Sequence, residues 1–406
     1  MLSIVNRIFS CFLSLVFAVG GLFSTGKLPT PTPIPSTNAG EYGQWVDPFI
    51  GTGGIPWMSA NLFPGATTLF GTVRLSPDTA FPFGIDPFKL GYAGYWYPQT
   101  RLLGFSHTRL SGTGARDMGH FRVTPAAGDA ADPLRRLTSP LLFAHAEEVA
   151  APGYYAVRLP EVPCLTELTA TTHAGVQRYT FETEKDAHLW VDATSFLFGG
   201  RAEEGHIKIR PEQNALEGEA RIFTDFTGRY GGLKAYFYAT FNVPLKAFST
   251  WREGVLEQGR TEAAGNDVGA DLNFGNLRGE ALEFQLGISF VSVANAKQNL
   301  ETEVGGRTFD GVRGIAGTAW EEQLSAIRIE TTDPEIKTIF YTALYHSMIM
   351  PTNFTDVNGQ YMGFDGEIAT AEDFTYRTDM SLWDTARTVH PLYNLIAPDV
   401  QRDSLK

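Results

Sequence analysis

Residues 282–290 read LEFQLGISF, and apolar side chains occupy every second position of this stretch. Successive side chains of a β-strand point to opposite faces, so the alternation predicts a strand with one face against a core. Looser versions of the pattern occur at residues 153–159, 165–171, 176–181, 188–194 and 233–243. Turn-forming pairs separate them, and no helical pattern intervenes. The sequence therefore predicts an antiparallel β-sandwich over residues 45–293.

The apolar spacing becomes helical after this region. Between Asp310 and Ile327 the apolar residues recur at the three- and four-residue spacing of a helix face. Asp333 and Pro334 then mark a helix start, because aspartate caps the first turn and proline fits the first helical position. We expect this second helix to be stopped by Pro351. The pattern predicts a helical linker over residues 294–332 and the first helices of an all-α domain over residues 333–406.

The N-terminus has the parts of a secretory signal. Arg7 precedes an apolar run over residues 8–23, and small residues follow it. This predicts a signal peptide over residues 1–25, with a retained N-terminal anchor as the alternative. The run is too short and too rich in glycine to favour a stable membrane span. Residues 26–44 form a linker rich in proline and threonine. We therefore expect an exported protein, located in the periplasm, at the cell surface or outside the cell.

The composition narrows the class of partner. The chain has 406 residues, with 32 lysines and arginines against 45 aspartates and glutamates, which gives a formal net charge of −13. Nucleic acid is not an expected partner, because phosphate binding needs clustered basic residues. Neutral sugars remain compatible with an acidic surface, and so do cations such as Ca²⁺ that prefer oxygen ligands. Cys164 is the only cysteine after the signal segment, so no intramolecular disulfide is expected.

Trp383 and Asp384 are the first candidates for binding residues. They lie at the start of a predicted helix that begins near Ser381 and that Pro391 should kink or end. A tryptophan ring can cover the apolar C–H face of a sugar, and a carboxylate can accept hydrogen bonds from two adjacent hydroxyls. The structural alternative places Trp383 in the core and pairs Asp384 with Arg387 one turn later.

The loop of residues 104–114 is the second candidate. It reads GFSHTRLSGTG and contains His107 and Arg109 among hydroxyl side chains and glycines. Small residues allow the backbone to approach a ligand closely. The structural alternative is a tight turn between strands that contains a histidine with its hydrogen bonds satisfied.

Together with other stretches, these motifs resemble glycoside hydrolase family 92, the calcium-dependent exo-acting α-mannosidases. The matching stretches follow the family order and are residues 46–54, 63–66, 74–79, 104–114, 152–155, 287–292, 338–346 and 381–385. The resemblance implies an N-terminal β-sandwich, joined by helices to an (α/α)₆ barrel, with the active site where the two meet. It also implies hydrolysis of terminal α-mannosides with inversion, in which an acid protonates the leaving oxygen and a base activates water.

The resemblance assigns roles to particular residues. Trp383 and Asp384 match positions that form the pocket for the terminal sugar, the −1 subsite. His107 and Arg109 belong to the loop that the sandwich contributes nearby. The catalytic acid, the catalytic base and the calcium ligands are expected beyond residue 406, so the barrel is expected to be incomplete and the chain inactive alone. The implied partners are mannose-containing glycans and the remainder of the catalytic domain.

Two other functions remain open from the sequence. The chain could be a non-catalytic carbohydrate-binding β-sandwich protein with a helical tail. It could also belong to another kind of glycosidase that combines a sandwich with a barrel.

Overall fold

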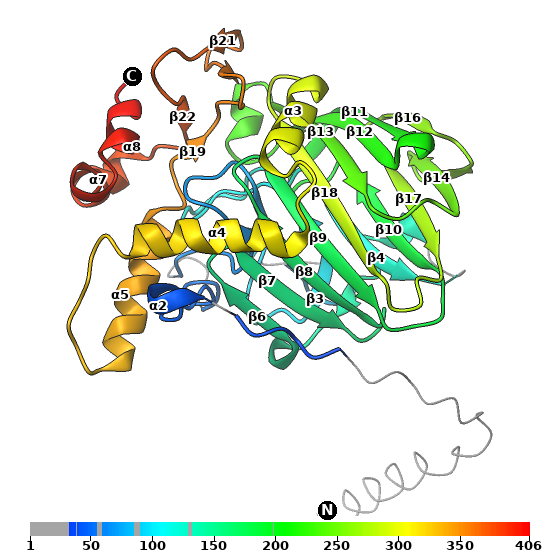
Figure 1. Cartoon of the computed structure of the whole chain (residues 1–406). Helices are drawn as coiled ribbons and strands as arrows, with labels where there is room; N and C mark the ends of the chain where they lie inside the picture. Colours follow the sequence, from blue (N-terminus) through cyan, green and yellow to red (C-terminus); the bar gives the residue numbers. More distant parts are fainter. Residues whose placement is uncertain (1–31, 38, 55–58, 85–89, 129–131, 198) are drawn as a thin grey trace, which may run out of the picture. The chain divides into compact units, whose positions relative to one another are not determined.

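The computed structural model describes residues 32–37, 39–54, 59–84, 90–128, 132–197 and 199–406 (Figure 1). The predicted signal peptide, residues 1–25, lies outside the described residues, and so does the first part of the predicted linker. Residues 33–406 form one structural unit, to which the following description applies.

Most of the described strands form two large antiparallel sheets. The first sheet has the order β1 (Ala66–Thr67), β2 (Arg74–Ala80), β3 (Arg101–Ser106), β4 (Arg122–Ala127), β10 (Ala187–Asp192), β17 (Val268–Gly275), β14 (Ala247–Arg252) and β15 (Val255–Gln258), with β5 (Leu141–Leu142) beside β3. The second has the order β16 (Glu262–Gly265), β11 (Arg201–Arg210), β12 (Ala215–Phe223), β13 (Leu233–Phe241), β18 (Ala281–Ser289), β9 (Ala174–Phe181), β8 (Cys164–Ala170), β7 (Tyr154–Leu159) and β6 (Glu148–Ala151). The predicted antiparallel sandwich is confirmed.

Strand β18 shows how the sequence pattern builds the core. Its alternating apolar side chains, including Phe284, Leu286 and Ile288, are fully buried and join the main core cluster. The strand lies between β13 and β9, so it is central in its sheet. Each apolar face removed from water in this way stabilises the fold by about 25 cal/mol per Å² of buried apolar surface.

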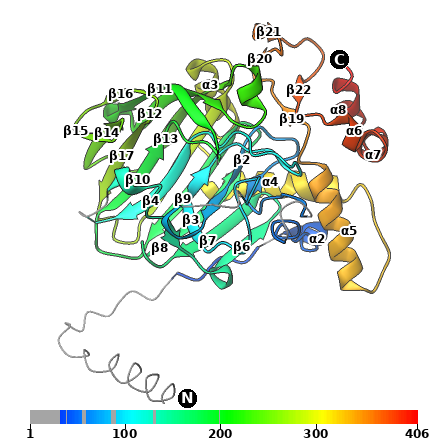
Figure 2. The same ribbon diagram turned by 180° about the vertical axis from the view of Figure 1, so that it is seen from behind.

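Two helices lie against the second sheet. Helices α3 (Val293–Glu303) and α4 (Phe309–Leu324) contact β18, β13, β8 and β9 (Figure 1). In the view from behind, β4 and β10 of the first sheet are on the near side (Figure 2). The helices predicted for the linker are therefore present, and their buried residues pack on the sheet.

Helix α5 (Pro334–Ser347) begins where the sequence predicts. The Asp333 side chain accepts a hydrogen bond of 2.9 Å from the Glu335 N–H, which caps the first turn. The helix ends at Ser347, before Pro351. Its Tyr345 packs against Trp320 of α4, with ring centroids 4.5 Å apart. The short helix α2 (Gly40–Gly43) also joins this group, because Glu321 of α4 accepts hydrogen bonds from its backbone.

The segment after α5 differs from the sequence prediction in two places. Within the predicted all-α segment, residues 352–378 contain two small strand pairs, β19 (Thr352–Asn353) with β22 (Arg377–Thr378) and β20 (Gln360–Met362) with β21 (Ile368–Thr370). The prediction of a single helix from Ser381 is also wrong. It is divided into α6 (Leu382–Thr385) and α7 (Val389–Ile396), which α8 (Pro398–Asp403) follows.

The position of Pro391 explains the second difference. The backbone leaves the helical conformation at Thr388, where φ is −129°, and α7 then starts at Val389. Pro391 therefore lies in the first turn of α7, where backbone N–H groups have no partner within the helix. Proline costs little at such a position, so it helps to start a new helix and does not end the old one. Short 3₁₀-helices, labelled η, complete the described fold. They are η1 (Pro82–Gly84), η2 (Pro133–Arg135), η3 (His145–Glu147), η4 (Pro211–Gln213) and η5 (Thr227–Tyr230).

A buried polar junction connects the sandwich to the segment after α5. The Asp356 carboxylate accepts hydrogen bonds from Ser289 Oγ at 2.6 Å, Asn295 Nδ2 at 2.8 Å and Asn299 Nδ2 at 2.7 Å. Ser289 belongs to β18, and the two asparagines belong to α3. The junction fixes how the chain leaves the sandwich.

None of the helices in the described ranges has the length and apolar content needed to span a bilayer.

A second junction, between His173 and Glu303, makes stability depend on pH. His173 Nδ1 lies 2.6 Å from Glu303 Oε1, and the His173 N–H donates to Oε2 at 2.8 Å. Burial opposes the charged imidazole, but the glutamate outweighs it and raises the pKa of His173. Burial likewise opposes the carboxylate, but His173 outweighs it and lowers the pKa of Glu303.

We predict that this pair stabilises the protein most between about pH 4.3 and 6.5, the pKa values of the unfolded carboxyl and imidazole groups. Stability is lost as the pH rises through the raised pKa of His173, and also as it falls through the lowered pKa of Glu303. Glu303→Gln should lower the free energy of unfolding by about 2 kcal/mol between about pH 4.3 and 6.5, and by less outside this range. Urea unfolding at a series of pH values measures this. The matched control is Glu301→Gln, which breaks an exposed pair with Lys297 on the same helix and should cost less than about 0.5 kcal/mol. A cost for Glu303→Gln that does not change with pH would contradict the prediction.

Candidate functional site

Two adjoining hollows lie between the sandwich and the segment after α5. Their volumes are about 250 Å³ and 890 Å³, and they share a common set of wall residues. The shared residues are Gly112, Thr113, Met350, Asp379, Met380, Ser381 and Asp384. We call the two hollows together the groove. One wall comes from the sandwich loop after β3, and the other comes from the residues between β22 and α6.

Trp383 and Asp384 both line the groove. They sit on the one-turn helix α6, where Ser381 Oγ donates a hydrogen bond of 2.7 Å to Asp384 Oδ2. Trp383 is 86% exposed, so the alternative that places it in the core does not hold for this chain. Among the ion pairs of the described residues, none joins Asp384 to Arg387. Both side chains are exposed on the groove.

Asp379 is a second carboxylate in the groove, which the sequence reasoning missed. Its backbone has a φ of 65°, in the left-handed region that few non-glycine residues adopt. The carboxylate accepts a hydrogen bond from Thr352 and lies 3.8 Å from Arg74 Nη1. Burial raises the pKa of Asp379, although Arg74 opposes the shift. Burial lowers the pKa of Arg74 to about 10, which leaves it charged at neutral pH. No spacing rule in the sequence marks a lone aspartate of this kind.

Two histidines line the smaller hollow. Burial lowers the pKa of His346 to about 4, so the ring is neutral at physiological pH. His390 Nδ1 lies 2.8 Å from Gln401 Oε1, which orients the ring. The Nε2 atoms of both rings are buried, and within the described part of the chain neither has a hydrogen-bond partner. Neither histidine was predicted from the sequence as a site residue.

The loop of residues 104–114 reaches the groove only through its distal part. Ser111, Gly112, Thr113 and Gly114 line the hollows. Leu110 also lines the larger hollow, whereas Phe105 to Arg109 before it are fully buried.

His107 and Arg109, the two site residues predicted on this loop, are fully buried and line neither hollow. His107 Nδ1 lies 2.6 Å from the Phe121 carbonyl, and burial lowers its pKa to about 4. Arg109 donates hydrogen bonds to several backbone carbonyls, including that of Ala93 at 2.8 Å, and pairs with Asp78 at 3.2 Å. In this structure both residues are buried and hold the loop in place through these contacts. The expectation that they face a sugar does not match this placement.

The sandwich supplies another part of the wall through Asp117. The buried Asp117 carboxylate accepts hydrogen bonds from the Thr227 N–H at 3.0 Å and the Thr227 hydroxyl at 2.9 Å. It thereby holds Phe226 and Thr227 against the larger hollow, which they line. The sequence does not show this connection, because Asp117 and Thr227 lie far apart along the chain.

The groove residues do not by themselves fit a calcium ion. Ca²⁺ takes six to eight oxygen ligands, usually with several carboxylates. Within the described ranges, no group of three or more histidine, cysteine, aspartate or glutamate residues is arranged to hold a metal. Asp379 and Asp384 line the same groove but do not make such a group.

Two family models match successive parts of the chain. The glycosyl hydrolase family 92 N-terminal domain matches residues 45–289, and the glycosyl hydrolase family 92 catalytic domain matches residues 295–406. A curated relative from Arthroderma benhamiae, described as an uncharacterized secreted glycosidase, is 27% identical over 349 residues, which are 79% of this chain and 43% of the relative.

Solved structures give the same result. A family GH92 α-mannosidase from Bacteroides thetaiotaomicron is 31% identical with a TM-score of 0.80, and the match covers 89% of this chain and 48% of that one. That enzyme has also been solved in complex with mannoimidazole. A family GH92 inverting mannosidase from the same species is 26% identical with a TM-score of 0.78, covering 91% of this chain and 48% of that one.

This chain thus spans about half the length of the relatives that it matches. The match runs from the sandwich through α8 and includes both walls of the groove. The chain belongs to glycosyl hydrolase family 92 and contains its N-terminal β-sandwich followed by the first helices of its catalytic domain.

Proposed function

We propose that this chain is the N-terminal part of an exported, inverting exo-α-mannosidase that hydrolyses terminal α-mannosides of glycans. The observation that carries the proposal is the exposure of Trp383 and Asp384 over a groove between the sandwich and the catalytic segment. The two relatives described as mannosidases support the substrate class, and the relative described as secreted supports export.

Within this proposal, Trp383 and Asp384 form a wall of the −1 subsite. The Trp383 ring covers the C–H face of the terminal sugar, which removes apolar surface from water. The Asp384 carboxylate accepts hydrogen bonds from two adjacent hydroxyls, and a charged acceptor makes such bonds stronger. His107 and Arg109 act indirectly, by holding the loop that carries Gly112 and Thr113 to the groove.

The hydrolytic step needs a carboxylic acid and a carboxylate base on opposite faces of the sugar. We place both in segments of the catalytic domain that the relatives have beyond the matched region, together with the calcium ligands that the family implies. Asp379 and Asp384 are assigned to binding and positioning, because both belong to the same short stretch of one wall.

Large apolar side chains of α5 and α7 are exposed and offer a packing surface for another part of the protein. Ile336 and Ile339 of α5, and Leu395 of α7, face solvent in the described structure. Ile336 and Ile339 are three residues apart on α5 and therefore share one helix face, which makes that face a candidate interaction surface. We propose that the remainder of the catalytic domain covers them, as the later helices of a barrel would.

The test compares this chain with a longer protein in which the remainder of the catalytic domain follows it. We expect the longer protein to release the aryl group from an aryl α-mannoside, with β-mannose as the first product by NMR, and to lose activity when calcium is chelated. We expect residues 1–406 alone to show no turnover.

Other outcomes would change the assignment. A preference of the longer protein for aryl α-glucosides would favour another glycosidase of the same architecture. Turnover by residues 1–406 that depends on one of their own carboxylates would show that the acid and base were placed wrongly.

A further inference from the structure

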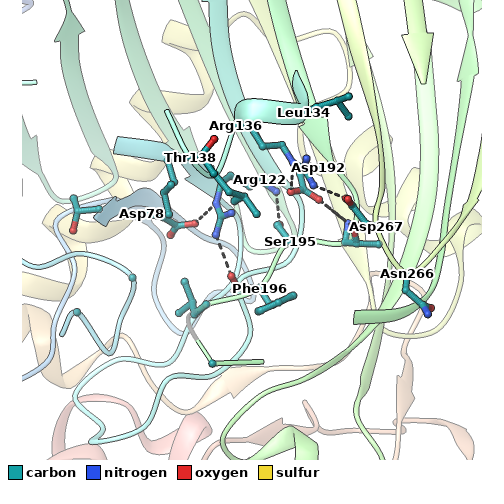
Figure 3. Close-up of a pocket in the computed structure, with 18 of the residues that line it drawn as sticks. Asp78, Arg122, Leu134, Arg136, Thr138, Asp192, Ser195, Phe196, Asn266 and Asp267 are labelled. Carbon is teal, nitrogen blue, oxygen red and sulfur yellow. Dashed lines mark hydrogen bonds and ion pairs between the residues drawn. The ribbon is translucent and has the colours of Figure 1, made fainter. Parts of the chain in front are cut away.

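A separate cavity of about 510 Å³ lies within the sandwich part of the chain (Figure 3). Its walls come from β2, β4, β10 and the segments around residues 134–138, 194–197 and 266–267. We call it the sandwich cavity. It shares no lining residue with the groove.

The sandwich cavity lies on the face of the first sheet that points away from the core. Val123 of β4 and Val191 of β10 are buried in the main core, whereas their neighbours Arg122 and Asp192 line the cavity. Adjacent residues of a strand point to opposite faces, so the cavity and the core lie on opposite sides of the sheet.

Two groups of paired charges form its polar wall. Arg122 Nε donates to Asp78 Oδ2 at 2.7 Å. Arg136 Nε donates to Asp192 Oδ2 at 2.8 Å, and its Nη2 pairs with Asp267. Figure 3 shows the Asp78–Arg122 pair and the group around Arg136 as separate parts of the wall.

These side chains are held rigidly. Arg122 also donates to the Phe196 carbonyl at 3.1 Å, and its backbone N–H donates to Ser195 Oγ at 2.8 Å. The Arg136 guanidinium lies over the Trp251 ring, 4.5 Å from its centroid. A polar wall fixed in this way loses little conformational entropy when a ligand binds.

Apolar side chains complete the lining. They are Leu90, Leu103, Leu134, Leu137, Phe196 and Leu197. Leu137 is 44% exposed, which places it at the opening of the cavity. Small-molecule sites are typically concave, about 300–1,000 Å³ in volume, and mostly apolar with a few convergent polar groups. The sandwich cavity has this character.

The charges of the wall select the class of ligand. Three aspartates, Asp78, Asp192 and Asp267, are balanced by three arginines, Arg122 and Arg136 in the wall and Arg109 behind it. The wall therefore carries no excess charge that would attract an anion. Each aspartate also has an arginine partner, which disfavours a cation. A sugar hydroxyl can donate to a carboxylate and accept from a guanidinium at the same time, and both kinds of group are present. The leucines and Phe196 can contact the C–H face of a ring.

We propose that the sandwich cavity is a second carbohydrate-binding site, separate from the groove. It binds a neutral pyranose unit of a glycan. The proposal does not depend on the proposed hydrolysis, because it is argued from the walls of the cavity itself. Such a site would hold one branch of a glycan while another branch occupies the groove.

The test is calorimetric titration of the full chain with the methyl glycosides of mannose, glucose, galactose and N-acetylglucosamine. We expect at least one of these probes to bind. Leu137→Trp narrows the opening and should weaken that binding at least tenfold. The matched control is Leu142→Trp, because Leu142 is similarly exposed at 37% but lines neither the groove nor the sandwich cavity. Asn266→Trp, which changes a different wall segment, should weaken binding in the same way.

The groove variant Trp383→Ala separates this proposal from the previous one. Binding to the sandwich cavity should persist in Trp383→Ala, even where activity of the longer protein is lost. Binding that disappears in Trp383→Ala and survives in Leu137→Trp would place the sugar in the groove and overturn the proposal. Failure of every methyl glycoside to bind, or binding of inorganic phosphate in their place, would also overturn it.

Discussion

Replacing Asp78 with alanine is expected to lower the free energy of unfolding by about 3–5 kcal/mol. Asp78 is buried between two arginines, with Oδ1 3.2 Å from Arg109 Nη2 and Oδ2 2.7 Å from Arg122 Nε. Removing the carboxylate would leave two buried guanidinium groups without their counter-charge. A buried charge without a partner costs far more than a lost surface contact.

Chemical unfolding followed by tryptophan fluorescence measures this effect. The control is Glu161→Ala, which removes the partner of Arg101 at 3.1 Å in a pair exposed to solvent. Exposed pairs contribute at most about 1 kcal/mol, so this variant should remain close to the parent chain. Equal losses in the free energy of unfolding for the two variants would contradict the prediction that Asp78 neutralises two buried arginines.

The second large effect is expected on activity. In the longer protein, Asp384→Ala should reduce kcat/KM for an aryl α-mannoside by about 100-fold or more. The loss of hydrogen bonds to a charged group costs about 1.5–3 kcal/mol each, and 1.36 kcal/mol corresponds to a factor of ten in rate. Two hydroxyl contacts with one carboxylate therefore account for a loss of this size.

The stability of the Asp384→Ala variant should stay within about 0.5 kcal/mol of the parent, because the side chain is exposed on a single helical turn. Asp399→Ala is the matched control, since Asp399 is an exposed aspartate of α8 that does not line the groove. It should leave kcat/KM unchanged. Near-normal activity in Asp384→Ala would remove Asp384 from the proposed −1 subsite.

The parts of the fold that were predicted correctly depend on local physics. The alternation in β18 and the Asp333–Pro334 start of α5 are each encoded within a few neighbouring residues. Strand faces and helix caps follow from backbone geometry, so a single sequence is enough to recognise them. The order of sandwich and helices follows from such elements.

The site was harder to predict, because burial depends on distant partners. His107 and Arg109 lie in a loop of glycines and hydroxyls that looks exposed, yet contacts with Phe121 and Asp78 keep them fully buried. No local sequence pattern marks Asp379 as a site residue, because its position in the groove depends on Arg74 and Thr352. Trp383 and Asp384 were predicted because their residue types suit a sugar, and the structure places both on the groove.

The Asp356 junction has a consequence for motion. Its carboxylate joins β18, α3 and the segment that leads into the groove through three direct hydrogen bonds. Opening a hinge at this point would leave a buried carboxylate unpaired, which is costly. The two walls of the groove should therefore move as one rigid body. We expect glycans to enter and leave through local loop motions, which occur in nanoseconds to microseconds, and not through the slower closure of one domain on another.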